Sequence, residues 1–144
     1  MKKILLTALF CMLLSASCFA KGGESLISDE LVADSLISSV LNGKPYTTVI
    51  SDFVPEASKD FTEAKYAEIR KGIADNFGKV DDIKLVGYSK NVGTDGNYAG
   101  VNQLVFLGRA TKGNYASFVV TVVNQGNVSK VIGMGMASAN VTPK

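Results

Sequence analysis

Residues 101–123 read VNQLVFLGRATKGNYASFVVTVV, and this stretch decides the fold. Two runs rich in β-branched and aromatic residues stand on either side of Lys112-Gly113-Asn114, which is a tight-hairpin signal. Similar runs occur before and after this pair, and glycine- and asparagine-rich segments at 91–100 and 124–127 separate them. The predicted strands are 83–90, 101–111, 115–123 and 128–137. Because each neighbouring pair can close as a hairpin, the sequence predicts a four-stranded antiparallel meander.

The chain before this sheet has helical patterning. Apolar residues recur on one arc between Val32 and Leu41, and serines and acids fill the opposite arc. Ser28 precedes two acidic residues, as is typical of a capped helix start, and Asn42-Gly43 is typical of a helix end. The pattern predicts a helix over residues 28–41.

A second helix is predicted before the first strand. Tyr66, Ile69, Ile73 and Phe77 form one apolar stripe, with Asp60 as the expected capping residue and Gly78 as the stop. Between these helices, residues 46–54 are interpreted as a short helix, with a strand as the alternative. Residues 55–60 are interpreted as a loop.

Helices followed by a meander predict an α+β fold, with N-terminal helices packed on one face of a curved four-stranded antiparallel sheet, as in a cone or cystatin-like roll. The single domain is expected to span 28–137, followed by a polar tail at 138–144. The run 115–123 is apolar on both faces, so the face away from the helices needs a second cover. Sheet curvature, a partner subunit or a ligand could each supply it.

The N-terminus has the pattern of an export signal. Residues 1–20, MKKILLTALFCMLLSASCFA, combine a basic start, an apolar run and small residues, which predicts a bacterial signal peptide cut after Ala20. Lipidation of Cys18 is the alternative, although Ser15 stands where a lipoprotein signal has an apolar residue. Residues 21–27 are expected to be a flexible lead. The apolar run is shorter than the ~20 residues of a membrane span, so we expect a periplasmic or secreted protein without a transmembrane segment after signal removal.

Composition excludes several function classes for the processed chain. The chain has no His, and both cysteines, Cys11 and Cys18, lie in the signal, so His-based triads, thiol nucleophiles and disulfides are excluded. Without Lys2 and Lys3 the 15 basic residues become 13, equal to the 13 acidic ones, so nucleic-acid binding is not expected. No metal or cofactor motif is present, and the adjacent Asp81-Asp82 would point to opposite faces of a strand.

Two segments carry a resemblance to a known family. Asp75-Asn76-Phe77-Gly78-Lys79 at a helix end and residues 126–133, GNVSKVIG, in the last hairpin resemble small secreted bacterial domains of the nuclear transport factor 2-like (SnoaL-type) superfamily. The resemblance covers about residues 28–137. It implies a cone-shaped fold with a pocket between sheet and helices, and often a dimer through the open sheet face. The Asp–His pair of catalytic members cannot be transferred, since this chain has no His.

Five residues are candidates for ligand binding. Arg109 follows Val105 and Leu107 on one strand face, where it could bind a carboxylate or phosphate, or lay its stem on the sheet with its charge in water. Four aromatic residues could line a pocket or belong to an ordinary core; they are Tyr66, Tyr88, Phe106 and Tyr115. A buried phenol hydroxyl would distinguish these cases by the partner that it needs.

These observations favour a non-catalytic exported module that binds a small apolar or amphipathic ligand between sheet and helices. The alternative is a protein-interaction unit of the cell envelope that forms a homodimer through the open sheet face. An enzyme without histidine is the third hypothesis, and an acid buried beside Tyr88 would favour it. The sequence suggests no catalytic residue, metal or cofactor.

Overall fold

The computed structural model describes residues 26–95, 98–125 and 127–139. The predicted signal peptide, with its cut after Ala20 or lipidation at Cys18, lies outside the described residues, as do most of the lead and the end of the polar tail. No helix in the described ranges is long and apolar enough to cross a membrane.

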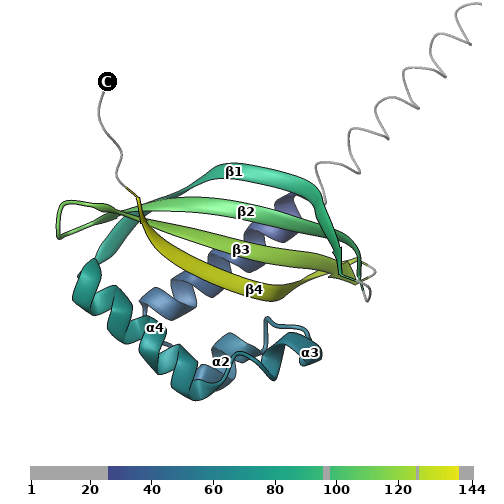
Figure 1. Ribbon diagram of the computed structural model, residues 1–144, viewed down its shortest axis with the longest axis horizontal. Helices are drawn as coiled ribbons and strands as arrows, with labels where there is room; N and C mark the ends of the chain where they lie inside the picture. The colour runs from purple at the N-terminus through teal and green to yellow at the C-terminus, as the bar shows by residue number, and fades with distance from the viewer. Residues whose placement is uncertain (1–25, 96–97, 126, 140–144) are drawn as a thin grey trace, which may run out of the picture.

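The fold is α+β, with helices followed by a four-stranded antiparallel sheet in the order β1-β2-β3-β4 (Figure 1). An N-terminal helix includes residues 26–41 and is followed by α2 (Tyr46–Ile50), α3 (Pro55–Ser58) and α4 (Glu63–Asn76). The strands are β1 (Val80–Asp95), β2 (Tyr98–Ala110), β3 (Tyr115–Gln125) and β4 (Val128–Ala139). The predicted meander and the predicted class are therefore confirmed.

Glycines end helices and close the hairpin where the sequence predicted. Gly43 follows the N-terminal helix with φ +67°, and Gly78 follows α4 with φ +71°. Gly113, at φ +87°, lies in the β2–β3 turn, where the Ala110 amide donates to the Asn114 carbonyl at 3.0 Å. These left-handed conformations favour glycine because it lacks a Cβ atom.

Three local predictions differ from the structure. Residues 26 and 27 are already helical, so Ser28 lies inside the N-terminal helix and is not its first residue. Thr62 caps α4 in place of Asp60, since its Oγ1 accepts from the Lys65 amide at 3.3 Å. The segment 55–60, predicted as a loop, contains α3. Pro55 is the first residue of this helix, where its fixed φ is already helical and where a backbone amide hydrogen would have no partner within the helix.

The β1–β2 hairpin is longer than predicted. Most of the expected connection at 91–100 belongs to strands, with Gly93 opposite Val101 and Asp95 opposite Tyr98. Four register shifts interrupt this pairing. Such shifts let a strand with extra residues stay paired while it bends, so Gly93 accompanies irregular pairing and does not end β1.

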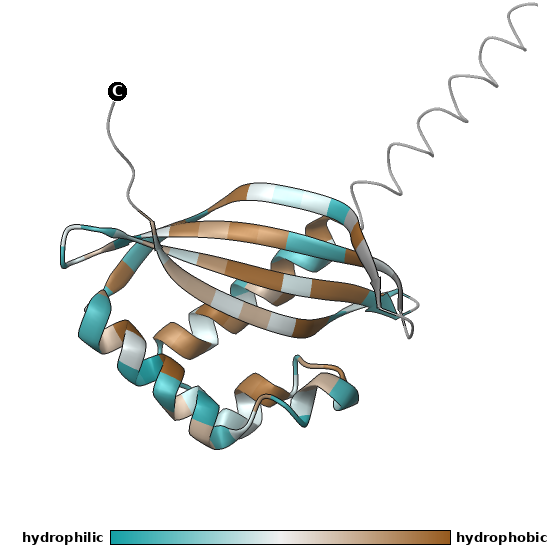
Figure 2. Ribbon diagram, viewed as in Figure 1, coloured by the Kyte–Doolittle hydropathy of each residue, from teal (hydrophilic) through white to brown (hydrophobic). Residues whose placement is uncertain are grey.

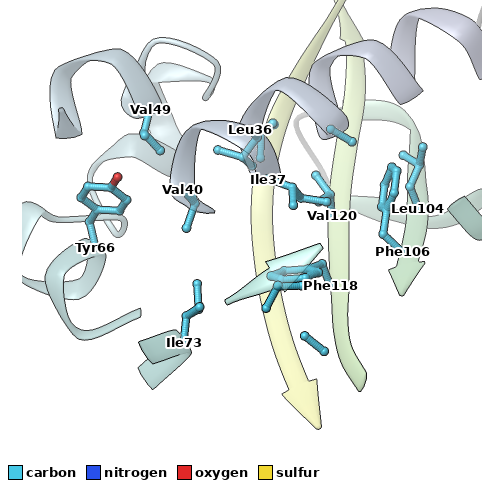
Figure 3. Packing of buried hydrophobic residues seen from close by; sticks show 14 of the residues in the cluster. Leu36, Ile37, Val40, Val49, Tyr66, Ile73, Leu104, Phe106, Phe118 and Val120 are labelled. Atoms are coloured by element: carbon cyan, nitrogen blue, oxygen red, sulfur yellow. The ribbon is translucent and has the colours of Figure 1, made fainter. Parts of the chain in front are cut away.

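The core lies between the N-terminal helix and one face of the sheet. Figure 3 shows Leu36 and Ile37 from the helix against Val120 and Phe118 of β3, and all four are fully buried. Leu104 and Phe106 of β2 extend this layer, with exposures of 0% and 2%. Hydrophobic residues concentrate on the same central strands in Figure 2. Core side chains therefore fill the space between this helix and the sheet.

A second, smaller core covers one end of the opposite sheet face. Phe53 forms a parallel bridge to Val131, and the Val54 amide donates to the Val131 carbonyl at 2.9 Å. Val54 then packs with Val101 and Val123, and Ala57 of α3 contacts this group. The segment 46–54, predicted as a short helix, is therefore helical only from Tyr46 to Ile50, and its Phe53 pairs with β4 at the edge of the sheet. The middle of this face, which we call the open face, carries half-buried Val105, Leu107 and Val119.

Candidate functional site

The structure spreads the five predicted ligand-binding residues over different parts of the fold. Tyr66 on α4 and Phe106 on β2 both belong to the main core, where Tyr66 contacts the ring of Phe61. Tyr88 contacts Asp29 at the opposite end of the sheet. Arg109 and Tyr115 are cross-strand partners on β2 and β3. These residues do not form one pocket.

The charge of Arg109 is compensated at the protein surface. Its guanidinium lies 3.3 Å from Asp82, which also lies 3.3 Å from Lys84, and all three side chains are largely exposed. Asp82 has a φ of +50°, an uncommon value for a residue with a side chain. Tyr115 opposite is 36% exposed. This arrangement matches the expectation of an arginine with its stem on the sheet and its charge in water.

Asp29 is fully buried, and it joins the N-terminal helix to three strands. Its Oδ2 accepts hydrogen bonds from Tyr88 Oη at 3.0 Å and from Asn102 Nδ2 at 2.8 Å. Its Oδ1 accepts one from Ser129 Oγ at 2.6 Å. Ser28 Oγ lies 2.8 Å from the same serine oxygen, and the Asn124 amide oxygen lies 3.0 Å from it. We call Asp29, Tyr88, Asn102 and Ser129 the Asp29 network.

This network is built to hold the helix on the sheet. None of its three donors carries a positive charge, so uncharged hydrogen bonds replace the water that the carboxylate loses on burial. A general base must reach within about 3 Å of the proton that it removes. Asp29 has no exposed surface, and donors occupy both of its oxygens. An acid does lie beside Tyr88, but this geometry favours a structural role for it.

The sequence contained a signal for this residue that the helical interpretation did not use. Asp29 stands four residues before Ala33 and eight before Ile37, so it extends the buried stripe by one turn. Asn102 likewise shares the alternation of Leu104 and Phe106 on β2. A polar residue in phase with a buried stripe indicates a buried hydrogen-bonding group.

A cleft of about 400 Å³ opens where the end of the N-terminal helix meets α2 and α4. Its lining comes from two segments that are far apart in the sequence; the residues are Gly43, Lys44, Pro45, Tyr46, Glu63, Tyr66, Ala67 and Arg70. The volume is within the usual range for small-molecule sites. We call this the tyrosine cleft.

Two locked tyrosine side chains line the tyrosine cleft. Tyr66 Oη donates to the Lys44 carbonyl at 2.6 Å, and Tyr46 Oη donates to the Phe61 carbonyl at 2.7 Å. Their ring centroids are 6.2 Å apart, and Phe61 and Phe53 stack behind them with centroids 4.6 Å apart. Since backbone carbonyls already accept from both hydroxyls, the rings offer the cleft rigid apolar surface.

Charged side chains flank these rings. Arg70 Cζ lies 6.0 Å from the centroid of the Tyr66 ring, and its guanidinium rests against Gly43. Lys44 and Glu63 also line the cleft, and all three charged side chains belong to exposed residues. The cleft therefore combines an apolar floor with a charged rim, which suits an amphipathic molecule.

A partly buried carboxyl lies close to this region. Burial raises the pKa of Asp52 above its ordinary value of 3.8, and the positive charges of Lys130 and Lys44 oppose that shift. The backbone carbonyl of Asp52 accepts from the Val131 amide at 2.9 Å. In the described ranges, no three His, Cys, Asp or Glu side chains are placed to share a metal ion.

Comparison of the chain with protein-family models, with curated proteins and with solved structures gave no match.

Proposed function

We propose that this protein is an exported, non-catalytic binding module that holds a small amphipathic ligand in the tyrosine cleft. The observation that carries the proposal is the pair of tyrosine rings, fixed by hydrogen bonds through Tyr46 Oη and Tyr66 Oη under an open volume of about 400 Å³. A rigid apolar surface binds ligand without the entropic cost of ordering side chains. Tyr66 is the one residue of the five predicted candidates that lines this cleft.

The proposal differs in location from the expected pocket between sheet and helices. Phe118, Leu104 and Leu36 are fully buried there and occupy that space. A ligand between the N-terminal helix and the sheet would have to displace closely packed side chains, which is costly because protein interiors resemble molecular crystals in density. The tyrosine cleft needs no such displacement.

The direct test fills the cleft from an exposed position. Ala67→Phe adds a ring inside the cleft, and Ala74→Phe, two turns further along α4 and outside the lining, is the matched control. The probe is the neutral dye N-phenyl-1-naphthylamine, whose fluorescence rises in apolar sites. We expect Ala67→Phe to weaken binding at least about tenfold and Ala74→Phe to leave it unchanged. Equal binding by both variants and the wild type would reject the tyrosine cleft.

We also propose that the sheet belongs to the nuclear transport factor 2-like cone architecture. Support comes from a helix that ends at Phe77-Gly78 and leads directly into β1. The element order also agrees with the resemblance. An experimental structure with an open flat sheet and no curvature toward the helices would contradict this assignment.

A second candidate function is homodimer formation through the open face. Half-buried Val105, Leu107 and Val119 lie there beside Gly133 and Gly135, and a Cβ atom at either glycine would meet only open space. Such an apolar surface can pack on its own copy, since two sheet faces stack about 10 Å apart. The equal numbers of acidic and basic residues expected after signal removal would not oppose self-association.

The oligomeric state tests this second candidate. Sedimentation equilibrium of the processed chain is expected to show a dimer that Val119→Lys dissociates, while Thr47→Lys, at an exposed position of α2, leaves it intact. A monomer at concentrations near 100 μM would reject the dimer without affecting the ligand proposal.

A further inference from the structure

We infer that the ligand of the tyrosine cleft carries a small anionic group, such as a carboxylate or sulfonate, and that Arg70 binds this group with help from Lys44. This inference rests on the proposed function, because it specifies the chemistry of a ligand in the same cleft.

Arg70 is held at the cleft without an acidic partner. Its guanidinium lies over the Tyr66 ring and against the backbone of Gly43, where a Cβ atom would collide with Nη2. Within the described ranges no acidic side chain lies within ion-pair distance of Arg70. The other described arginine, Arg109, does have such a partner in Asp82. The contact with Tyr66 orients a guanidinium whose hydrogen-bond donors stay available.

The rim of the cleft has an excess of positive charge. Arg70 and Lys44 contribute two cations and Glu63 one anion, and Glu63 forms no salt bridge with either cation. Lys44 also lies close enough to Asp52 for its charge to oppose the rise that burial causes in the pKa of that carboxyl, so its charge is shared with a second group. Arg70 is therefore the principal site for an anion, and its planar guanidinium can donate two parallel hydrogen bonds to a carboxylate.

The apolar floor defines the rest of the ligand. Pro45 and the Tyr46 ring line the same cleft and leave an uncharged surface beside the guanidinium. A molecule with an acidic group at Arg70 and an aromatic or short aliphatic body on these residues satisfies both parts. An inorganic anion would use the cation alone and would leave the accessible surface of Pro45 and Tyr46 uncovered.

Two dyes that share the same aromatic rings test this inference. 8-Anilinonaphthalene-1-sulfonate carries an anionic group, and N-phenyl-1-naphthylamine has the same rings without it. Arg70→Gln is compared with Lys59→Gln. Lys59 is the exposed residue that directly follows α3 and lies outside the cleft lining, so this control also removes one positive charge. We expect Arg70→Gln to weaken binding of the sulfonate about tenfold and of the neutral dye less than twofold. Lys59→Gln should change neither.

The outcomes distinguish failure of the anion inference from failure of the proposed function. If Arg70→Gln leaves sulfonate binding unchanged while the neutral dye still binds, the anion inference is overturned and the proposed function stands. If the variant weakens both dyes equally and lowers the melting temperature, Arg70 supports the fold and the inference is also overturned. If neither dye binds the wild type, both proposals are rejected. Lys44→Gln provides a second readout, with an expected two- to threefold loss for the sulfonate alone, since its contribution is a shared point charge.

Discussion

The Asp29→Ala substitution removes a buried carboxylate that accepts hydrogen bonds from three side chains. Asn102 is 2% exposed and loses the acceptor that it has at 2.8 Å, which costs about 1–3 kcal/mol. Tyr88 is only half-buried and can turn to water, and Ser129 retains a contact with Asn124, so each adds less, about 0.5–1 kcal/mol. We therefore expect the free energy of unfolding to fall by about 2–5 kcal/mol in total.

Urea unfolding followed by circular dichroism measures this change. The midpoint should fall while the slope with denaturant stays constant, because the surface exposed on unfolding is nearly unchanged. Asp29→Asn keeps the volume, and the Ser129 hydroxyl can turn to accept from the new amide, so its cost should be about 1 kcal/mol. An Asp29→Ala variant within 1 kcal/mol of the wild type would refute the assignment of the Asp29 network to the attachment of the helix.

Three further predictions concern other parts of the fold. Phe118→Ala should cost about 3–5 kcal/mol in chemical denaturation, because it opens a cavity under the N-terminal helix, and a smaller cost would mean that the core relaxes around it. Gly43→Ala should cost about 1–2 kcal/mol or more, since the position has φ +67° and a methyl group would displace Arg70; an unchanged melting temperature would contradict this. Burial raises the pKa of Asp52, so protonation favours the folded state, and the stability gained from it is lost as pH rises through the folded pKa above 3.8. Asp52→Asn should therefore be slightly more stable than the wild type at pH 7 and equal to it near pH 3, and the reverse order would show that Lys130 and Lys44 outweigh burial.

The sheet could be predicted because local signals and long-range pairing agree. The turn at Lys112-Gly113-Asn114 and the apolar alternation on both sides of it specify one hairpin, and the structure pairs Arg109 with Tyr115 across it. The β1–β2 hairpin was harder to predict. The glycines in 91–100 usually indicate a turn, but here shifts of register keep the strands paired through that segment.

The candidate site could not be predicted in the same way. The tyrosine cleft joins residues 43–46 to residues 63–70, and no spacing within either segment indicates the other. The aromatic candidates could be selected from the sequence, but the partners of their hydroxyl groups could not. Tyr66 donates to a backbone carbonyl and Tyr88 to Asp29, and Phe106 belongs to the main core.

The Asp29 network shows a different limit of prediction from sequence. A single acidic residue at the start of a helix is most simply explained by the helix dipole, and that explanation places Asp29 in water. Its burial depends on Tyr88, Asn102 and Ser129, each on a different strand. Only the assembled sheet brings these three donors to one carboxylate.

Titration of the isotope-labelled processed chain with 8-anilinonaphthalene-1-sulfonate, followed by amide chemical shifts in NMR, locates the binding site residue by residue. The largest shifts are expected at Gly43, Tyr66, Ala67 and Arg70, around the tyrosine cleft. Shifts concentrated at Val105, Leu107 and Val119 would place binding on the open face and would contradict ligand binding in the tyrosine cleft.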